Sequence, residues 1–279
     1  MGIPHLLLFA TPLLLLVMAI EYRLSKKRRR DLYDRSDTKS NFGIAFGGIL
    51  FGGLASAYGL SLYYFFYTQA APFRQAFLRY GDLGWTWYVW VFAVLADDFT
   101  YYWFHRISHQ VHIFWAFHVV HHSSEHFNYS TAIRNGWLSI LHKPFFWIWM
   151  SIVGFHPLMI ITCMSLNSFY QFFCHTQLCY SWKNLQCILC APEIHAIHHG
   201  KNEAFIDKNF AGIFTFYDRL FGTFMPHKKG QAVDFGVTHP PKSNNIFEIT
   251  FHELVSLFRL MKKEANWRSR IVLLFRAPK

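Results

Sequence analysis

The sequence predicts an all-α protein that crosses a membrane several times. Hydrophobic residues make up 53% of its 279 residues and only 15% are charged, against roughly 25% in ordinary soluble domains. Long uncharged runs alternate with basic clusters, and histidines gather in short groups beside these runs. We expect about three full membrane spans, a short helical hairpin and a histidine-rich helical cap that faces the cytoplasm and holds a di-metal site.

The first apolar run covers residues 3–20, which is close to the length of about 20 residues needed for one span. No basic residue precedes it, whereas a basic cluster follows it, made of Arg23, Lys26, Lys27, Arg28, Arg29 and Arg30. A signal peptide carries its positive charge before the apolar run, so we predict a true membrane helix. The positive-inside rule places the basic cluster in the cytoplasm.

Two further runs predict a second and a third span. Residues 42–71 contain no charge and carry glycines four apart, a spacing that lets membrane helices pack closely. Residues 84–104 could extend about 31 Å as a helix that returns to the cytoplasm. Asp98 lies near the inner end of this helix, on the same face as His105. We therefore expect Asp98 to accept a hydrogen bond from a histidine of its own helix.

Residues 144–174 are apolar but contain a break at Gly154-Phe155-His156-Pro157, which predicts a hairpin of two short helices. A hairpin returns to its starting side whether or not it crosses the bilayer, so the later histidines are expected on the cytoplasmic face as well. Residues 200–250 are more polar and are expected to form a cytoplasmic cap. Residues 251–276 predict a basic amphipathic helix at the membrane surface.

The histidines follow helical spacing. They occur as His105-x-x-x-His109, His118-x-x-His121-His122 and His195-x-x-His198-His199, with His175 before the last group. Positions i, i+3 and i+4 share one face of a helix, so each group is expected to direct two or three imidazoles at one point. Neutral imidazole binds zinc, copper, iron and nickel. Nine donors exceed the needs of one ion and fit two ions with four or five ligands each.

A metal site at the mouth of membrane helices predicts a lipid substrate whose polar head stays near water. Two iron ions could activate O2 for attack on an unactivated C–H bond, which zinc, having no redox chemistry, cannot do; zinc in a purified sample is still compatible with the sequence. A histidine-rich metal transporter or sensor and a catalytically inert lipid-binding relative stay open as alternatives. The net charge of +11 flanks apolar runs and therefore favours anionic lipid headgroups over nucleic acid.

These motifs resemble a known family. The three histidine groups and the lead-in DFTYYWFHR at residues 98–106 resemble the fatty acid hydroxylase/sterol desaturase superfamily of membrane di-iron oxygenases. Three stretches are most similar to its alkylglycerol monooxygenase branch: HHSSEHFNYSTAIR at 121–134, FYQFFCHT at 169–176 and IHHGKNEAFIDKNFAGIFTFYDRLFGTF at 197–224. Compared with that branch, His126 stands where an acidic residue is expected, and further membrane helices are expected to be missing after the matched region.

The resemblance implies a di-iron centre facing the cytoplasm, in the endoplasmic reticulum or a bacterial inner membrane. Its ligands would be His105, His109, His118, His121, His122, His175, His195, His198 and His199, with supporting roles for Asp98, Glu125, Asn202 and Asp207. The reaction would be O2-dependent hydroxylation of a sterol, a fatty acyl chain or an ether lipid, with desaturation as an alternative at the same site. The reductant would be tetrahydrobiopterin or a separate cytochrome b5-type or ferredoxin-type donor.

These expectations divide the chain into three parts. Residues 1–41 would form the N-terminal membrane helix and a basic cytoplasmic linker. Residues 42–226 would form the membrane-embedded catalytic domain that carries the histidines. Residues 227–279 would form a cytoplasmic or interfacial tail that contains the amphipathic helix.

Overall fold

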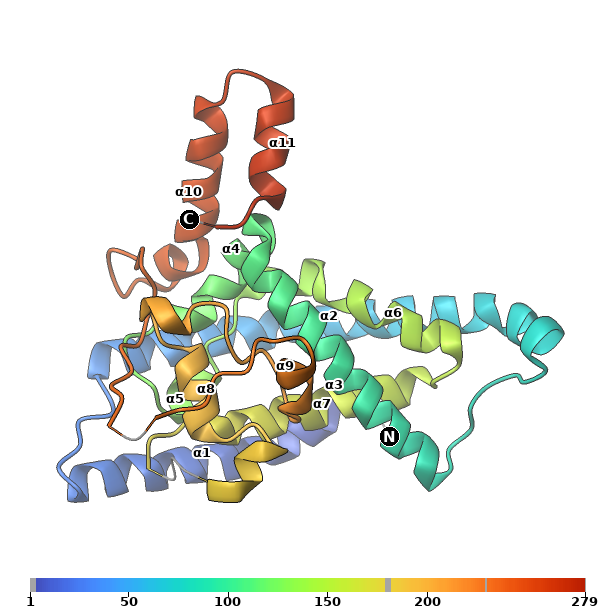
Figure 1. The fold of residues 1–279 in the computed structure, drawn as a ribbon, viewed down its shortest axis with the longest axis horizontal. Coiled ribbons are helices and arrows are strands. Elements are labelled where there is room, and N and C mark those ends of the chain that lie inside the picture. Colours follow the sequence, from blue (N-terminus) through green and yellow to red (C-terminus); the bar gives the residue numbers. More distant parts are fainter. Residues whose placement is uncertain (1–3, 179–181, 229, 279) are drawn as a thin grey trace.

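The computed structural model describes residues 4–178, 182–228 and 230–278, and over these residues it is helical without a strand. The long helix α2, Arg35–Phe73, lies across the molecule, and α3, Trp87–Gln110, passes obliquely over it (Figure 1). Two isolated β-bridges, at residues 189 with 214 and 200 with 235, are the extended pairings within this described part. The prediction of an all-α fold is confirmed.

Shorter elements surround these two helices. The α-helices are α1 Pro4–Lys27, α4 His112–His122, α5 Tyr129–Ala132, α6 Lys143–Val153, α7 Pro157–Cys174, α8 Pro192–His198, α9 Phe216–Leu220, α10 Ile246–Lys263 and α11 Trp267–Phe275. The short 3-10 turns are η2 Trp137–Leu141, η3 Lys183–Cys187 and η4 Glu203–Phe205, and a π-helical turn η1 Arg74–Leu78 extends α2.

The break between α6 and α7 lies where the sequence predicts it. Gly154 ends α6 in the left-handed region with φ +114°, and its amide donates to the carbonyl of Met150 at 3.1 Å. A residue with a side chain would be strained there. Pro157 starts α7 at a position where no amide hydrogen is needed, and the side chain of His156 accepts a hydrogen bond from the amide of Leu158 at 3.2 Å.

One apolar core joins α3 to this hairpin. Trp147 and Met150 of α6 and Met159 and Ile160 of α7 are fully buried and pack in one cluster with Ala93 of α3. Close packing of this kind fixes the position of α3 relative to the hairpin. The C-terminal half of α3, which carries the first histidine motif, is thereby held over the end of α7.

Two helices have the length and composition to cross a membrane, residues 35–78 and Pro157–Cys174. The expected third span begins at Trp87 rather than at residue 84 and is not one of these two, because α3 carries Asp97, Asp98 and many Tyr and Trp side chains. The expected first span falls in α1, whose side chains are described only from residue 10. Two candidate spans are therefore supported within the described residues, and the other expected spans stay predictions.

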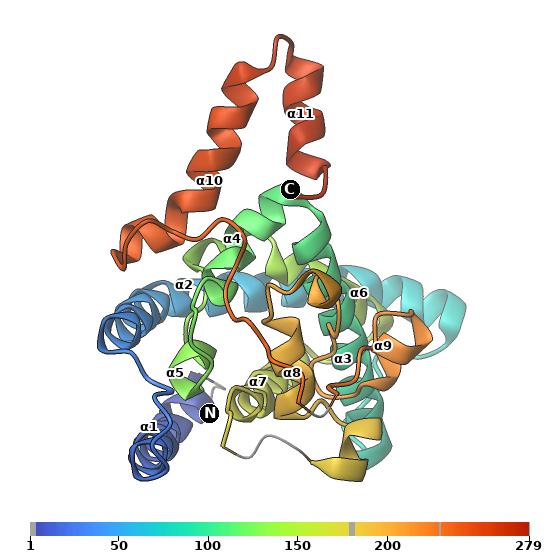
Figure 2. The same cartoon turned by 60° about the vertical axis from the view of Figure 1, so that its left-hand side comes forward.

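The C-terminal part differs from the expected single amphipathic helix. It forms two helices, α10 and α11, which stand away from the body as a hairpin (Figure 2). Asn266 causes the break, since its side chain accepts the amide of Ser269 at 2.9 Å and starts a new helix. The middle of α10 is fixed to α4 by a 2.7 Å contact between His112 Nε2 and Glu253 Oε1.

Candidate metal centre

The nine histidines that the sequence selects gather at one place inside the molecule. Five form one group: His105, His109, His118, His122 and His198. Four form a second group: His121, His175, His195 and His199. Within each group one ligand atom per ring lies within 4.8 Å of the others. The groups adjoin, because the ring centroids of His122 and His199 are 4.4 Å apart.

Each H-x-x-H-H motif divides between the two groups. In α4, His118 and His122 belong to the five-histidine group and His121 to the other. In α8 and its C-cap the assignment is reversed, since His195 and His199 join the four-histidine group and His198 does not. Positions i and i+4 lie nearly in line along a helix, while position i+3 is displaced about 100° from i+4. Each H-x-x-H-H motif therefore directs two imidazoles into one group, within the two or three that its spacing predicts, and its third histidine into the other group.

Backbone carbonyls orient four of the rings. In each, Nδ1 lies 2.8 to 3.2 Å from a carbonyl oxygen. The pairs are His105 with Phe210, His198 with Lys208, His121 with Arg134 and His175 with Gln171. A carbonyl oxygen only accepts, so each Nδ1 carries a proton and the lone pair lies on Nε2. This is how metal-binding histidines are commonly oriented.

Within each group, Nε2 atoms of different rings face one another at close range. Nε2 of His121 lies 3.2 Å from that of His175, which lies 3.0 Å from that of His195. In the other group, buried Nε2 atoms of His105, His109 and His198 have no hydrogen-bond partner. Two acceptors at such distances repel unless a proton or a metal ion lies between them.

Protonation is disfavoured at neutral pH. Burial lowers the pKa of His121 to about 4 and that of His198 to about 3, because a charged imidazole loses its hydration there. The rings therefore stay neutral, and neutral imidazole nitrogen is a good ligand for iron and zinc. The donor set fits two metal ions, one in each group.

A loop that follows α8 supports the five-histidine group. The carboxylate of Asp98 accepts hydrogen bonds from the amides of Ile213 and Phe214 at 2.7 and 2.9 Å, and that of Asp218 accepts the amide of Phe210 at 2.8 Å. The same loop supplies the carbonyls that orient His105 and His198. Asp98 therefore acts through the loop and does not form the expected direct bond to a histidine, because backbone amides occupy both of its oxygens.

The other predicted supporting residues lie at different distances from the histidines. Asp207 Oδ1 is 3.8 Å from His109 Nδ1, and its expected supporting role stays a prediction. Glu125 is exposed, with Oε1 3.6 Å from Lys201 Nζ. Asn202 accepts a backbone amide at 2.9 Å in a surface turn. Within the described residues, Asp207 alone of these three contacts a histidine of the centre.

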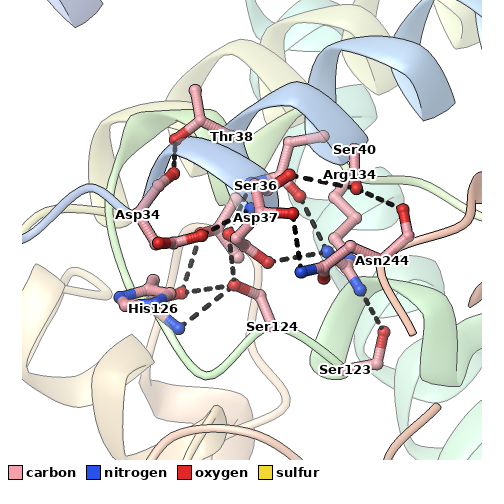
Figure 3. Close-up of polar contacts among 12 residues, drawn as sticks. Asp34, Ser36, Asp37, Thr38, Ser40, Ser123, Ser124, His126, Arg134 and Asn244 are labelled. Atoms are coloured by element: carbon pink, nitrogen blue, oxygen red, sulfur yellow. Dashed lines mark hydrogen bonds and ion pairs between the residues drawn. The ribbon is translucent and has the colours of Figure 1, made fainter. Parts of the chain in front are cut away.

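The four-histidine group depends on a buried ion pair that the sequence did not indicate. Arg134 Nη1 lies 2.9 Å from Asp37 Oδ1 (Figure 3). The guanidinium also donates to the carbonyl of Val120 and the hydroxyl of Ser123, at the end of α4. The backbone carbonyl of Arg134 accepts a hydrogen bond from Nδ1 of His121. Asp37 precedes Arg134 by 97 residues, so no local motif could reveal the pair.

Glu21 is a second buried residue that sequence reasoning missed. Its carboxylate accepts hydrogen bonds from the hydroxyls of Tyr33 and Thr176 and from the amide of Tyr129. Thr176 directly follows His175. Glu21 therefore fastens α1 to the segment that carries one histidine of the four-histidine group. Burial raises the pKa of this carboxyl.

Comparisons with known proteins find similarity to hydroxylases and monooxygenases. Residues 90–223 match the family model described as Fatty acid hydroxylase. Alkylglycerol monooxygenases of Homo sapiens and Danio rerio are each 37% identical over 199 residues, 71% of this chain and 43% of the relative. Cholesterol 25-hydroxylase of Homo sapiens is 25% identical over 135 residues, 48% of this chain and 50% of that protein. No solved structure matches the chain.

The family match contains all nine histidines and the supporting loop, but not Glu21 or Asp37. The chain spans less than half the length of the alkylglycerol monooxygenases that it matches. These matches identify residues 90–223 as a fatty acid hydroxylase domain and the chain as a homologue of the alkylglycerol monooxygenases.

Proposed function

We propose that this protein is a membrane monooxygenase that hydroxylates a C–H bond of a lipid. The observation that carries the proposal is the pair of adjoining groups of buried, neutral imidazoles with their Nε2 lone pairs turned inward. Two iron ions bound there would activate O2, so that one oxygen atom enters the lipid and the other leaves as water, with two electrons from an external reductant. No side chain of the chain is needed as a nucleophile.

The protein's own residues orient and isolate this centre. Carbonyls of residues 208 and 210 hold two rings of the five-histidine group, and those of residues 134 and 171 hold two of the four-histidine group. Burial of all nine rings keeps bulk water away, which strengthens electrostatic interactions inside the site. We propose that Asp207 fixes the ring orientation of His109 through the polar contact between them.

Alkylglycerols are the first substrate class to test, because the relatives with the higher identity are alkylglycerol monooxygenases. Sterols and fatty acyl chains are the next two classes. A cavity of about 790 Å³ on the N-terminal half of α3, lined by apolar side chains that include Phe92, Leu95 and Phe99, supports a lipid substrate. Desaturation would begin with the same removal of a hydrogen atom and is a second outcome at this site.

We further propose that the protein is an integral membrane protein of the endoplasmic reticulum or a bacterial inner membrane, with its histidines facing the cytoplasm. The two candidate spans support membrane insertion, and the basic cluster after the first apolar run supports this orientation. Reducing equivalents would come from tetrahydrobiopterin or from a separate cytochrome b5-type or ferredoxin-type protein.

The test is lipid oxidation by the purified, iron-loaded protein with isotopically labelled O2. Alkylglycerol, sterol and fatty acid are offered separately, each with tetrahydrobiopterin or an electron-transfer protein. We expect one class to gain one labelled oxygen atom, and we expect the His121→Ala variant to insert into membranes but to show no turnover. Full activity of that variant, or no oxidised lipid in any combination, would contradict the proposal.

Metal exchange separates this enzyme from a transporter or sensor. The enzyme should retain two tightly bound irons per chain during prolonged dialysis, because the rings are buried and fixed by hydrogen bonds. Exchangeable zinc without oxygen consumption would favour transport or sensing, and tight zinc without oxygen consumption would favour an inert lipid-binding relative.

A further inference from the structure

A second cavity lies between the two N-terminal helices, far in sequence from the fatty acid hydroxylase domain. It has a volume of about 520 Å³ and is lined by α1, by the linker at residues 33–34 and by the first two turns of α2. The two helices lie apart from each other at this end (Figure 2). We call this cavity the N-terminal cleft.

The lining of the N-terminal cleft changes from apolar to basic along its length. Leu15, Met18 and Phe42 line it at one end, and Arg35 and Lys39 line it at the other. Both helices follow the same gradient, because α1 becomes basic where it approaches the linker and α2 becomes apolar as it leaves the linker. A gradient from cationic to apolar over one groove matches an amphiphile with an anionic head.

The basic end of the cleft carries more positive than negative charge. Arg35 and Lys39 are four residues apart on α2 and therefore share one face, and no ion pair holds either of them in the described part of the chain. Lys26 also lines the cleft but is paired with exposed Asp31 at 2.9 Å. The carboxylate of Asp34 is engaged as the N-cap of α2. The lining therefore keeps a net positive charge, because Arg35 and Lys39 outnumber the carboxylate of Asp34.

The cleft is preformed. Tyr33 forms part of its wall and donates its hydroxyl hydrogen bond to buried Glu21. Glu21 is in turn fixed by Tyr129 and Thr176. α1 is therefore anchored by the hydrogen bonds of Glu21, which does not line the cleft, and a cavity stays open between α1 and α2.

We propose that the N-terminal cleft binds an anionic phospholipid, with its phosphate at Arg35 and Lys39 and one acyl chain along Leu15, Met18 and Phe42. This lipid is a bound constituent of the protein and not its substrate, and the site does not depend on the reaction proposed above. Its headgroup lies at the linker end of α1 and α2, where the basic cluster Arg23–Arg30 also meets the lipid surface.

The test is native mass spectrometry of the full chain released from nanodiscs of phosphatidylglycerol and phosphatidylcholine. We expect the wild type to retain phosphatidylglycerol selectively and the Arg35→Gln/Lys39→Gln variant to lose roughly 30-fold in affinity, since each basic residue near an anionic surface contributes about fivefold. The matched control is Arg28→Gln/Arg29→Gln, which removes the same charge from the neighbouring linker and should keep the selectivity. Equal losses in both double variants would show diffuse charge attraction and overturn the site.

Two further arms locate the lipid. Ala19→Trp fills the apolar part of the cleft without a change of charge, and we expect it to abolish phosphatidylglycerol retention; unchanged retention would place the lipid elsewhere. Excess inorganic phosphate should not displace the lipid from the wild type, because the acyl chain contributes to binding. Displacement by phosphate alone would show a site for the free anion and would contradict a phospholipid site.

Discussion

The two histidine groups use the same ligand type but are held by different parts of the chain. The five-histidine group is supported by the loop after α8, which Asp98 and Asp218 fasten. The four-histidine group is supported by the N-terminal region, through Asp37 with Arg134 and through Glu21 with Thr176. The supports of the five-histidine group thus lie inside the matched residues 90–223, whereas those of the four-histidine group include residues outside this match. Each group should therefore fail separately.

The largest expected effect comes from removing one ligand from each group. His195→Ala leaves three histidines in its group and should lose that metal ion, whereas His109→Ala leaves four and should keep its ion. Turnover should fall at least about 100-fold in both variants, because even the partners of metal ligands often contribute 10–100-fold. Elemental analysis should give about one ion per chain for His195→Ala and about two for His109→Ala. Equal metal loss in both would remove the distinction between the groups.

The supporting carboxylates provide a second contrast. Asp37→Asn leaves the guanidinium of Arg134 buried without its countercharge, and breaking a buried pair in this way costs about 3–5 kcal/mol of stability. Because the carbonyl of Arg134 orients His121, we expect metal affinity at the four-histidine group to fall by about 10–100-fold. The measurements are thermal unfolding and a metal titration followed by a spectroscopic signal of each site.

Asp218→Asn is the matched variant for the five-histidine group. It keeps the volume of the side chain but weakens the hydrogen bonds that hold the loop at Phe210, so it should lower affinity at that group and leave the other unchanged. If Asp37→Asn and Asp218→Asn weaken both groups alike, the two supports are coupled and the comparison is wrong.

Acidification should destabilise the metal-free protein through both groups. His121 and His198 have a pKa of about 4 and about 3 in the folded protein, below the value of about 6.5 in an unfolded chain. The unfolded state therefore binds more protons below pH ~6.5. The free energy of unfolding falls as the pH is lowered from ~6.5, and this loss of stability is complete near the pKa of the folded protein. His121 alone would contribute about 3 kcal/mol. Denaturant unfolding at several pH values, with and without iron, measures this; stability that is constant from pH ~7 to ~4 would contradict it.

The smallest effect is expected at Glu125, which lies outside both groups. Its carboxylate is exposed and only 3.6 Å from Lys201 Nζ, and exposed pairs of this kind contribute about 0–1 kcal/mol. Glu125→Gln should leave metal content at two ions and turnover within about twofold, as judged by oxygen consumption. A large loss of turnover would assign Glu125 a role at the centre that its position does not indicate.

The sequence predicted which histidines gather better than it predicted the residues that support them. Helical spacing selected eight of the nine histidines, because a helix converts i, i+4 spacing into proximity, and His175 was added from its place at the end of the hairpin and from the family resemblance. It could not divide them into sets of five and four, since that depends on how α3, α4 and α8 are packed. Asp37 and Glu21 were missed because their partners, Arg134 and Thr176, are distant in the chain. Asp98 was expected to bond directly to a histidine. It accepts backbone amides of a loop far along the chain instead, and that loop orients the histidines.

The break between α10 and α11 is a feature of the fold that the sequence pattern did not predict. Apolar and basic residues continue with helical periodicity through residues 251–276, so the pattern predicts one helix. The first helix ends at Lys263, and one capping residue, Asn266, starts the second helix by accepting a hydrogen bond from the amide of Ser269. Capping residues of this kind are common outside helix starts, so the composition of the segment alone did not select the break.

The most direct test of the central claim is anomalous X-ray scattering at the iron edge from crystals of the iron-loaded protein. The account predicts two peaks per chain, one enclosed by Nε2 atoms of His105, His109, His118, His122 and His198, and the other by those of His121, His175, His195 and His199. A single peak, or two peaks within one of these groups, would contradict it.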